Sequence, residues 1–134
     1  MGLDQAMIVA GIGCRAGATA QEIDAAIAAA LTSGGLANDV LELIATSSAK
    51  AAEQGIVAAA TTRGVPLVFV AQSDLEQMSG RAVTRSERVV ALAGVPSVAE
   101  CAALAAAGDA GRLIVPRVAV GPATCALATS GDAP

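Results

Sequence analysis

The fold is decided by the stretch IVAGIGCRAGAT, residues 8–19, in which a short apolar run leads into glycines and then into a helix start. The run over residues 7–12 is rich in β-branched side chains and bounded by glycines, which is typical of a strand covered on both faces. Thr19 followed by Glu22 forms a capping box, so we expect a helix to begin at Ala20. The stretch therefore predicts the strand, loop and helix from which α/β domains are built.

The loop inside this stretch holds three glycines, a thiol and a guanidinium group. Gly11, Gly13 and Gly17 allow positive φ angles and let a ligand approach the main chain closely. Cys14 and Arg15 fall in the turn between strand and helix, where α/β folds usually place their ligands. We therefore expect the loop to be part of a ligand site.

The rest of the chain alternates between helical and strand patterns. Apolar residues at 23, 26, 27, 30 and 31 share one face of an amphipathic helix that ends near two glycines. Capping boxes over residues 73–76 and 97–100 each predict a helix start. The other expected elements are strands over 41–46 and 67–71, the second typical of a buried parallel strand, and helices over 53–63 and 86–93.

Two β-rich runs, 112–120 and 123–129, are separated by Gly121-Pro122 and predict a terminal hairpin. Pro116 inside the first run predicts an edge strand or a bulge. The chain therefore predicts a single three-layer α/β/α domain over residues 7–129, with a mostly parallel mixed sheet of about five strands ending in the C-terminal hairpin. We expect loose termini over residues 1–6 and 130–134.

Composition excludes several classes of protein. The 134 residues carry a net charge of −4 and include one Phe and no Trp or Tyr, so neither the basic surface nor the base stacking of a nucleic-acid-binding protein is expected. No uncharged apolar run approaches the roughly 18 residues of a membrane span, and no basic region before a long apolar stretch marks a secretory signal. We therefore expect a cytoplasmic protein without nucleic-acid or membrane partners.

The chain contains no histidine, which excludes a Ser/His or Cys/His catalytic pair. The three cysteines, Cys14, Cys101 and Cys125, have unrelated spacings and indicate neither a disulfide framework nor a metal site. Cys101 and Cys125 are expected in the core. The sequence thus predicts no metal and no cofactor.

Four motifs in order resemble the CobE/CbiG C-terminal-domain family of cobalamin (vitamin B12) biosynthesis. They are GIGCR at 11–15 with TAQEI at 19–23, the loop around Lys50, GVPSVAE at 94–100 and LIVPR at 113–117. The resemblance covers residues 7–129, and the chain is similar to a stand-alone, CobE-like member. Gly121 and Thr124 also match the family pattern, whereas two aspartates that usually flank the lysine are replaced here by Ser48 and Ala52.

The resemblance implies a protein that binds a tetrapyrrole or precorrin intermediate in a carrier or accessory role. A precorrin methyltransferase is then a candidate partner. The family's larger member, CbiG, is associated with opening the lactone of cobalt-precorrin-5A, so the alternative is a hydrolase-like enzyme in which Lys50 or Cys14 acts as base or nucleophile. A third reading is a phosphate- or nucleotide-binding module that uses the glycine loop as an anion nest.

Cations are the first candidates for binding such a ligand. A corrinoid precursor carries many carboxylates, and an arginine fork is the side chain best shaped to bind one. We expect Arg15, Lys50 and Arg117 to gather at the strand ends, with the backbone amides of the glycine loop as further carboxylate donors. The ordinary alternative is that these charges are solvated independently.

Several polar residues near the expected site allow two interpretations. A helix N-terminus and Arg15 would lower the pKa of Cys14, but cysteines are commonly just buried, so we favour a structural role over catalysis. Ser97 is expected to present a helix N-terminus to an anion, and the capping box accounts for Glu100 without chemistry. The polar segment 81–88 is either a lid over the site or a surface connection.

Overall fold

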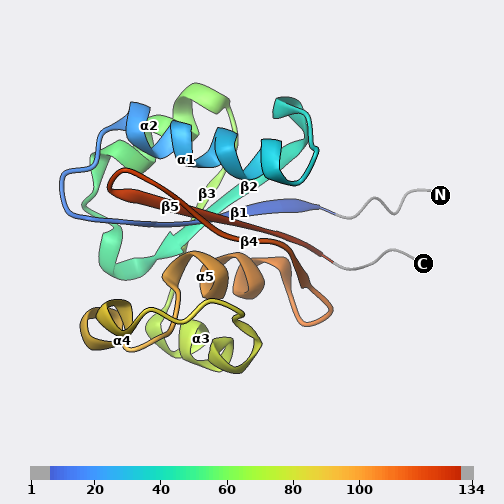
Figure 1. Cartoon of the computed structure of the whole chain (residues 1–134). Coiled ribbons are helices and arrows are strands. Elements are labelled where there is room, and N and C mark those ends of the chain that lie inside the picture. The colour runs from blue at the N-terminus through green and yellow to red at the C-terminus, as the bar shows by residue number, and fades with distance from the viewer. Residues whose placement is uncertain (1–6, 131–134) are drawn as a thin grey trace.

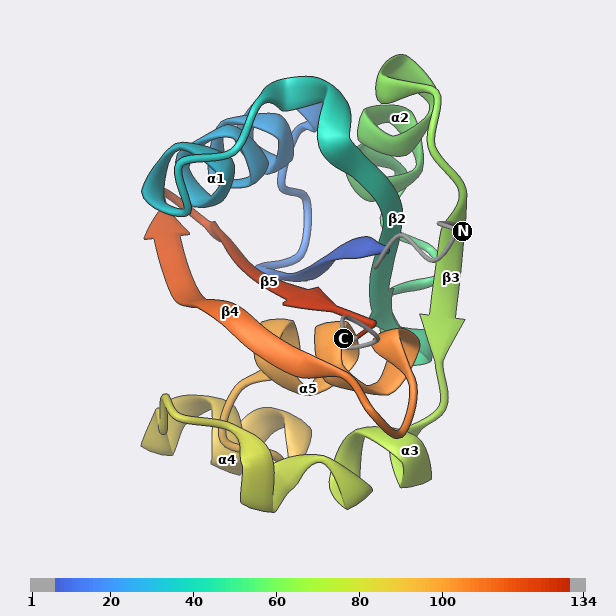
Figure 2. The same cartoon turned by 90° about the vertical axis from the view of Figure 1, so that its right-hand side faces the viewer.

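The computed structural model describes residues 7–130. Five strands form one sheet in the order β3-β2-β1-β5-β4 (Figure 2). β1 pairs in parallel with β2, and β2 with β3, whereas β5 is antiparallel to both of its neighbours, β1 and β4. Four strands therefore run in one direction and only β5 runs against them, which confirms the mixed α/β sheet with a C-terminal hairpin. The elements are β1 (Ile8–Cys14), α1 (Ala20–Ser33), η1 (Asn38–Val40), β2 (Leu41–Ser47), η2 (Ser48–Lys50), α2 (Gln54–Arg63), β3 (Leu67–Val70), α3 (Gln72–Gln77), η3 (Ser79–Arg81), α4 (Glu87–Ala93), α5 (Val98–Ala107), β4 (Arg112–Val120) and β5 (Ala123–Thr129).

Helices cover both faces of the sheet, as Figure 1 shows. α1 and α2 pack on one face, where the largest buried side chains include Ile12, Ile23 and Ile27. α5 packs on the other face, and α3 and α4 lie outside α5 (Figure 1). Leu75 and Leu104 are fully buried on that side. The sheet is packed between two apolar clusters, so the edge formed by the carboxyl ends of its parallel strands is held in position.

The first helix forms as its sequence predicts. The Thr19 hydroxyl accepts a hydrogen bond from the Glu22 backbone N–H at 3.1 Å, and the Glu22 carboxylate accepts one from the Thr19 N–H at 2.9 Å. Both halves of the capping box are present, and the helix begins at Ala20. Its buried face consists of the five apolar positions that recur with helical spacing: Ile23, Ala26, Ile27, Ala30 and Leu31.

The glycines of β1 serve helix packing, which corrects one prediction. The strand continues to Cys14, and neither Gly11 nor Gly13 has the expected positive φ; Gly17 does, at 82°. A Cβ atom on Gly11 would lie 1.9 Å from the carbonyl oxygen of Ala99 in α5. Gly11 is therefore required because the backbone of α5 approaches the strand directly.

Three further expectations are wrong in detail. β3 is an edge strand rather than a core strand, because nothing pairs beyond it, and Val68 and Phe69 are 36% and 43% exposed. α3 begins at Gln72 without a side-chain cap, so the predicted capping box at 73–76 does not form. Ser130, expected in a loose terminus, exchanges two hydrogen bonds with Met7, at 2.9 and 3.0 Å. The rest of that prediction, residues 1–6 and 131–134, lies outside the described residues.

β4 confirms the expected effect of Pro116. The strand lies at the edge of the sheet, and its pairing with β5 shifts register between Leu113 and Val115 and again between Val115 and Val118.

Within residues 7–130, no single helix has the length and apolar character to cross a membrane; α4 and α5 meet both criteria only as a pair, which is bent by 66°.

Candidate functional site

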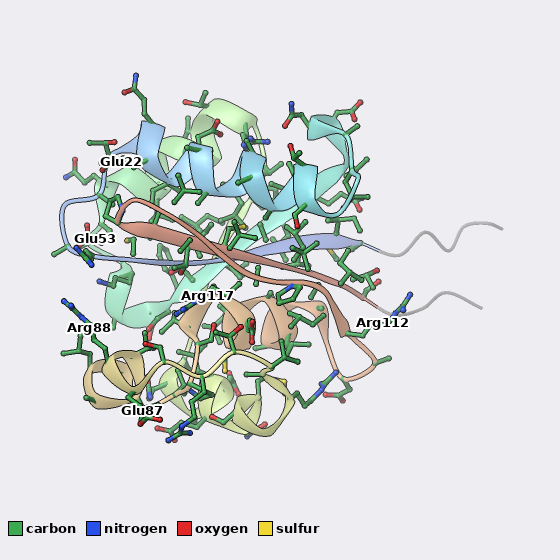
Figure 3. The ribbon with its side chains drawn as sticks, viewed as in Figure 1. Glu22, Glu53, Glu87, Arg88, Arg112 and Arg117 are labelled. Carbon is green, nitrogen blue, oxygen red and sulfur yellow. The ribbon has the colours of Figure 1, made fainter. Side chains whose placement is uncertain are left out.

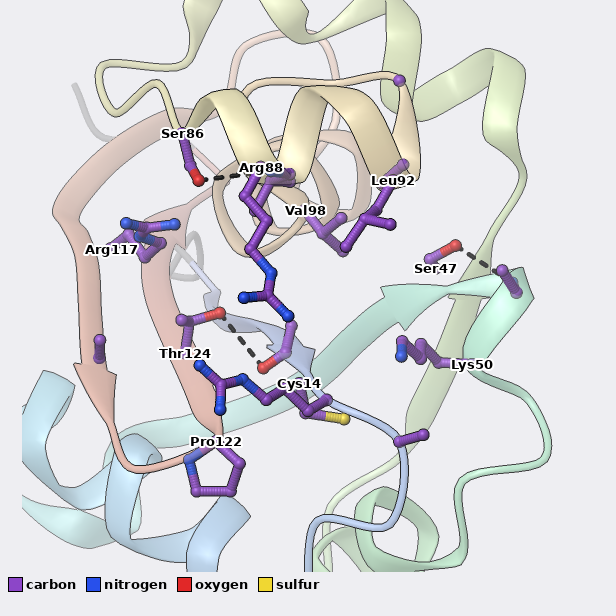
Figure 4. A pocket seen from close by; sticks show the side chains of 18 of the residues that line it. Cys14, Ser47, Lys50, Ser86, Arg88, Leu92, Val98, Arg117, Pro122 and Thr124 are labelled. Atoms are coloured by element: carbon purple, nitrogen blue, oxygen red, sulfur yellow. Dashed lines mark hydrogen bonds between the residues drawn. The ribbon is translucent and has the colours of Figure 1, made fainter.

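A cleft of about 930 Å³ opens at the carboxyl edge of the sheet. The end of β1, the η2 segment after β2 and the turn between β4 and β5 form its floor, and α4 with the start of α5 forms its wall (Figure 4). Parallel strands end here and helices begin, which is where open α/β sheets bind ligands. Cleft size also falls within the usual range for small-molecule sites.

Four cations line the cleft. Arg15 follows β1, Lys50 ends η2, Arg88 lies in the first turn of α4 and Arg117 lies in β4. Figure 4 shows Arg88 extending from α4 toward the strand ends, with Arg117 on the neighbouring strand and Lys50 across the cleft. The structure thus brings together the three predicted cations and adds Arg88.

The charge of the cleft is one-sided. Four of the chain's eight lysines and arginines line it, and among residues 7–130 no acidic side chain does. In the same range, the two salt bridges join Arg63 to Asp24 and Arg85 to Glu87, so they neutralise none of the four cations. A protein with a net charge of −4 thereby presents a positive cleft, which attracts anions.

An apolar strip faces these charges. Val89, Leu92 and Ala93 of α4 line the cleft together with Val98 at the start of α5. Leu92 is 76% exposed, so the strip leaves apolar surface open to a ligand. The cleft therefore suits a ligand that has an apolar face and several negative groups.

The expected anion nest is not formed by the glycines. Gly13 lines the cleft, but Gly11 lies beneath α5 and does not. The Gly17 N–H donates to the Glu53 carboxylate at 2.9 Å and is therefore engaged within the protein. The loop is held instead through the Arg15 N–H, which donates to the Pro122 carbonyl at 2.9 Å and ties β1 to the hairpin turn.

Cys14 lines the cleft with a protonated thiol. Burial raises its pKa above the ordinary value of 9.0; Lys50 opposes that effect and Glu53 adds to it. The predicted lowering of the pKa by a helix N-terminus and Arg15 is wrong, because β1 keeps Cys14 half-buried within the sheet. Cys101 and Cys125 are buried, as expected.

Ser97 does not reach the cleft. It is fully buried, and its hydroxyl accepts a hydrogen bond from the Glu100 N–H at 3.2 Å as the N-cap of α5. The prediction that Ser97 presents a free helix N-terminus to a ligand is therefore not supported, because its hydroxyl is buried and caps the first turn of α5.

Glu100 is not the second half of a capping box. Its side chain is fully buried and accepts hydrogen bonds from the N–H groups of Val83 at 2.8 Å, Thr84 at 2.9 Å and Arg117 at 2.8 Å. Burial by itself raises the pKa of Glu100, but hydrogen bonds from the Thr84 side chain and from these three backbone amides outweigh it, so the pKa lies below 4.5. Glu100 is ionised at neutral pH.

Segment 81–88 is fastened along its length. The Arg81 guanidinium donates to the Gly111 carbonyl, Glu100 holds Val83 and Thr84, and the Ser86 N–H donates to the Pro96 carbonyl at 3.1 Å. α4, which follows, contains no buried residue and forms the cleft wall. The segment is thus a tethered connection into that wall.

Arg88 is the cleft residue that sequence reasoning missed. It belongs to segment 81–88, whose structure the sequence leaves open, and the other three cleft cations lie outside α4. The spacing of Arg88 and Val89 with Leu92 and Ala93, at i and i+4, places all four on one helix face. A cation beside an apolar strip on one helix face was the sequence signal that could have identified Arg88 as a site residue. Within the described residues, no three Cys, Asp or Glu side chains are grouped to hold a metal ion.

Comparisons with known proteins relate this chain to cobalamin biosynthesis. Residues 8–128 match the family described as cobalamin synthesis G C-terminus. A curated relative from Sinorhizobium sp, protein CobE, is 40% identical over 121 residues, which cover 90% of this chain and 79% of the relative.

Solved structures agree with this match. The crystal structure of CobE, a protein from the cobalamin (vitamin B12) biosynthetic pathway, has a TM-score of 0.87 and 31% identity, over 92% of this chain and 90% of that one. The cobalamin biosynthesis protein chiG from Agrobacterium tumefaciens has a TM-score of 0.72 and 43% identity, over 91% and 97% of the two chains.

Proposed function

Because the chain belongs to the cobalamin synthesis G C-terminus family and is a cobalamin biosynthesis protein, we propose that it binds a tetrapyrrole polycarboxylate of the precorrin type in its cleft. The role is that of a carrier or accessory protein, which holds the intermediate between enzymes in the cytoplasm. A precorrin methyltransferase is the proposed enzyme partner, since such a carrier must exchange its cargo with an enzyme that modifies it.

The observation that carries this proposal is the cation cluster. Arg15, Lys50, Arg88 and Arg117 line one cleft that no acidic side chain of residues 7–130 enters. Guanidinium groups bind carboxylates through paired hydrogen bonds, and several such groups at different angles favour a ligand with carboxylates around its rim. This pattern fits a precorrin, which carries acetate and propionate side chains around its macrocycle.

The apolar strip supports the same ligand. The macrocycle of a tetrapyrrole is a broad apolar surface, and Val89, Leu92 and Val98 offer it contacts without aromatic stacking. A simple phosphate would leave this strip exposed. A phosphate-binding module would need free N–H donors in the glycine loop. The Gly17 N–H instead donates to the Glu53 carboxylate, which also places a negative charge beside the loop.

One observation favours binding over hydrolysis. The neutral Cys14 thiol is a poor nucleophile at physiological pH because its pKa is raised. The alternative, a hydrolase acting on the lactone or acyl fragment, requires Cys14 or Lys50 to act as nucleophile or base. Turnover of a lactone-containing precorrin that is lost in Cys14→Ala or Lys50→Ala would establish that alternative.

The experiment is a visible-absorbance titration of the protein with a hydrogenobyrinate-type polycarboxylate, followed by gel filtration. The protein has no Trp or Tyr, so the pigment dominates the spectrum. We expect a shifted band that elutes with the protein. A spectrum that continues to change after mixing would indicate turnover, and pigment that elutes separately would contradict the proposal.

A matched pair of variants locates the site. Arg117→Ala should weaken binding about tenfold, the cost of one charge-assisted hydrogen bond. Arg112→Ala removes the same group from the opposite end of the same strand, away from the cleft (Figure 3), and should leave binding unchanged. Equal losses in the two variants would show that only net charge matters.

A further inference from the structure

Glu100 is a buried carboxylate that the proposed binding chemistry does not use directly. One oxygen, Oε1, accepts from the N–H groups of Val83 and Thr84, and the other, Oε2, accepts from the N–H of Arg117. The side chain has no exposed surface. It therefore joins α5 to two segments that are distant in sequence.

Both segments lack backbone partners of their own at these points. Val83 and Thr84 lie between η3 and α4, outside any helix or strand. Arg117 lies in the irregular part of β4, between the pairs Val115–Leu127 and Val118–Cys125. The Glu100 carboxylate therefore supplies the hydrogen-bond acceptor that the local structure of both segments lacks.

Each of the two segments also carries a cleft cation. Val83 and Thr84 lead into α4, whose first turn presents Arg88, and Arg117 is itself a cleft residue. Since α4 buries no side chain, its position depends on its attachments: the Glu100 bonds before it, the Ser86 N–H to the Pro96 carbonyl, and Gln72 Nε2, which donates to the Ala93 carbonyl at 2.8 Å.

We propose that Glu100 is a positioning residue that sets the separation of Arg88 and Arg117, and thereby the spacing of the carboxylates that the cleft accepts. The inference rests on the proposed function, because it assigns a role within that binding site. It identifies the preferred ligand as one whose carboxylates match the separation between the Arg88 and Arg117 side chains, both of which Figure 4 shows in the cleft.

The ionised form is required for this role. A carboxylate offers two acceptor oxygens and here receives three backbone N–H bonds. In Glu100→Gln, one position becomes an NH₂ donor facing an N–H donor, so one of the two segments loses its anchor while the side-chain volume is kept.

A double-mutant cycle tests the coupling. Glu100→Gln should weaken binding of a hydrogenobyrinate-type polycarboxylate about tenfold in the wild-type background. The loss should be much smaller when Arg88 and Arg117 are already alanine, because the cations to be positioned are gone. It should persist in an Arg15→Ala background, since Arg15 is held by the β1 loop and not by Glu100. Equal losses in both backgrounds would overturn the proposal.

Hydrogen exchange separates this inference from the proposed function. In ligand-free protein, Glu100→Gln should speed amide exchange at Val83 and Thr84 or at Arg117 by a larger factor than at Ile23 in α1. Unchanged exchange would overturn the positioning role even if the pigment binds. Wild-type protein that binds no pigment would overturn the proposed function, while exchange would still decide the role of Glu100. If Glu100→Gln does not fold, Glu100→Asp retracts the carboxylate by one methylene and gives the same readouts.

Discussion

At the scale of single residues, the local environment decides the chemistry of each ionisable group. The pKa of Glu100 is lowered, whereas the pKa of Cys14 is raised. Glu100 is fully buried yet stays ionised, because hydrogen bonds from the Thr84 side chain and from three backbone N–H groups compensate its desolvation. The Cys14 thiol is only half-buried, yet its pKa is raised further above 9.0, because one lysine does not offset burial and the nearby Glu53. Hydrogen-bond donors therefore decide the direction of the shift: they lower the pKa of Glu100 although burial raises it, whereas burial prevails at Cys14.

Glu100 makes stability depend on pH in the acid range. Its pKa is below 4.5 in the folded protein, so its contribution is complete above that pH and is lost as pH falls through the folded value. Glu100→Gln should lower the free energy of unfolding at pH 7 by about 1.5 to 3 kcal/mol, and by less at pH 3. Urea denaturation at both values measures this, and an equal loss at both would contradict it.

Cys14 should react slowly with alkylating agents. Because its pKa is raised, the rate of iodoacetamide labelling should still be rising at pH 9. Lys50→Ala should slow the reaction further, since Lys50 lowers that pKa. Mass spectrometry of the Cys14 peptide measures the rate, and rapid labelling at pH 7 would restore the nucleophile interpretation.

At the scale of elements, α5 is the part that organises the site. It lies on β1 without intervening side chains, caps itself with Ser97 and sends Glu100 toward the α4 connection and β4. α4 has little core of its own and takes its place from these attachments. The cleft wall is therefore as stable as the contact between α5 and the sheet.

Gly11→Ala should disrupt that contact. The added methyl would lie 1.9 Å from the Ala99 carbonyl oxygen, so α5 must move, and we expect a loss of about 3 kcal/mol in stability. Gly80→Ala is the matched control, because a Cβ atom there meets nothing within 4 Å. Thermal unfolding compares the two variants, and equal melting temperatures would contradict direct packing of α5 on β1.

At the scale of the whole molecule, charge is distributed unevenly. The protein is acidic, with a net charge of −4, and yet half of its lysines and arginines line one cleft. The remaining surface repels anions while the cleft attracts them, which directs a polycarboxylate to a single place.

Binding should therefore weaken with salt. Raising the ionic strength from about 0.05 M to about 0.5 M should lower the affinity for a hydrogenobyrinate-type polycarboxylate roughly tenfold, because the exposed cations are screened. The Arg117→Ala variant should show a shallower dependence than wild type. Absorbance titrations across a salt series measure both slopes, and a salt-independent affinity would assign the binding energy to the apolar strip.

The sequence by itself determined the order of the elements and the fold class, because these depend on local signals. The capping box at Thr19 and the apolar spacing of α1 act within one helix, and Gly121-Pro122 with the flanking β-rich runs defines the hairpin. It also singled out Arg15, Lys50 and Arg117, and the fold brings all three to one cleft, although Arg117 lies within β4 rather than at its end.

Only the tertiary structure decided which roles Gly11, Glu100 and Arg88 have in the fold and in the cleft. Gly11 resembles a loop glycine in sequence, but the approach of α5 makes it a packing residue. Glu100 matches a capping box, but its partners Val83 and Arg117 lie 17 residues away on either side, beyond any local pattern. Arg88 became a site residue only when these long-range hydrogen bonds placed α4 over the cleft, since contacts between distant segments are not encoded in short-range periodicity.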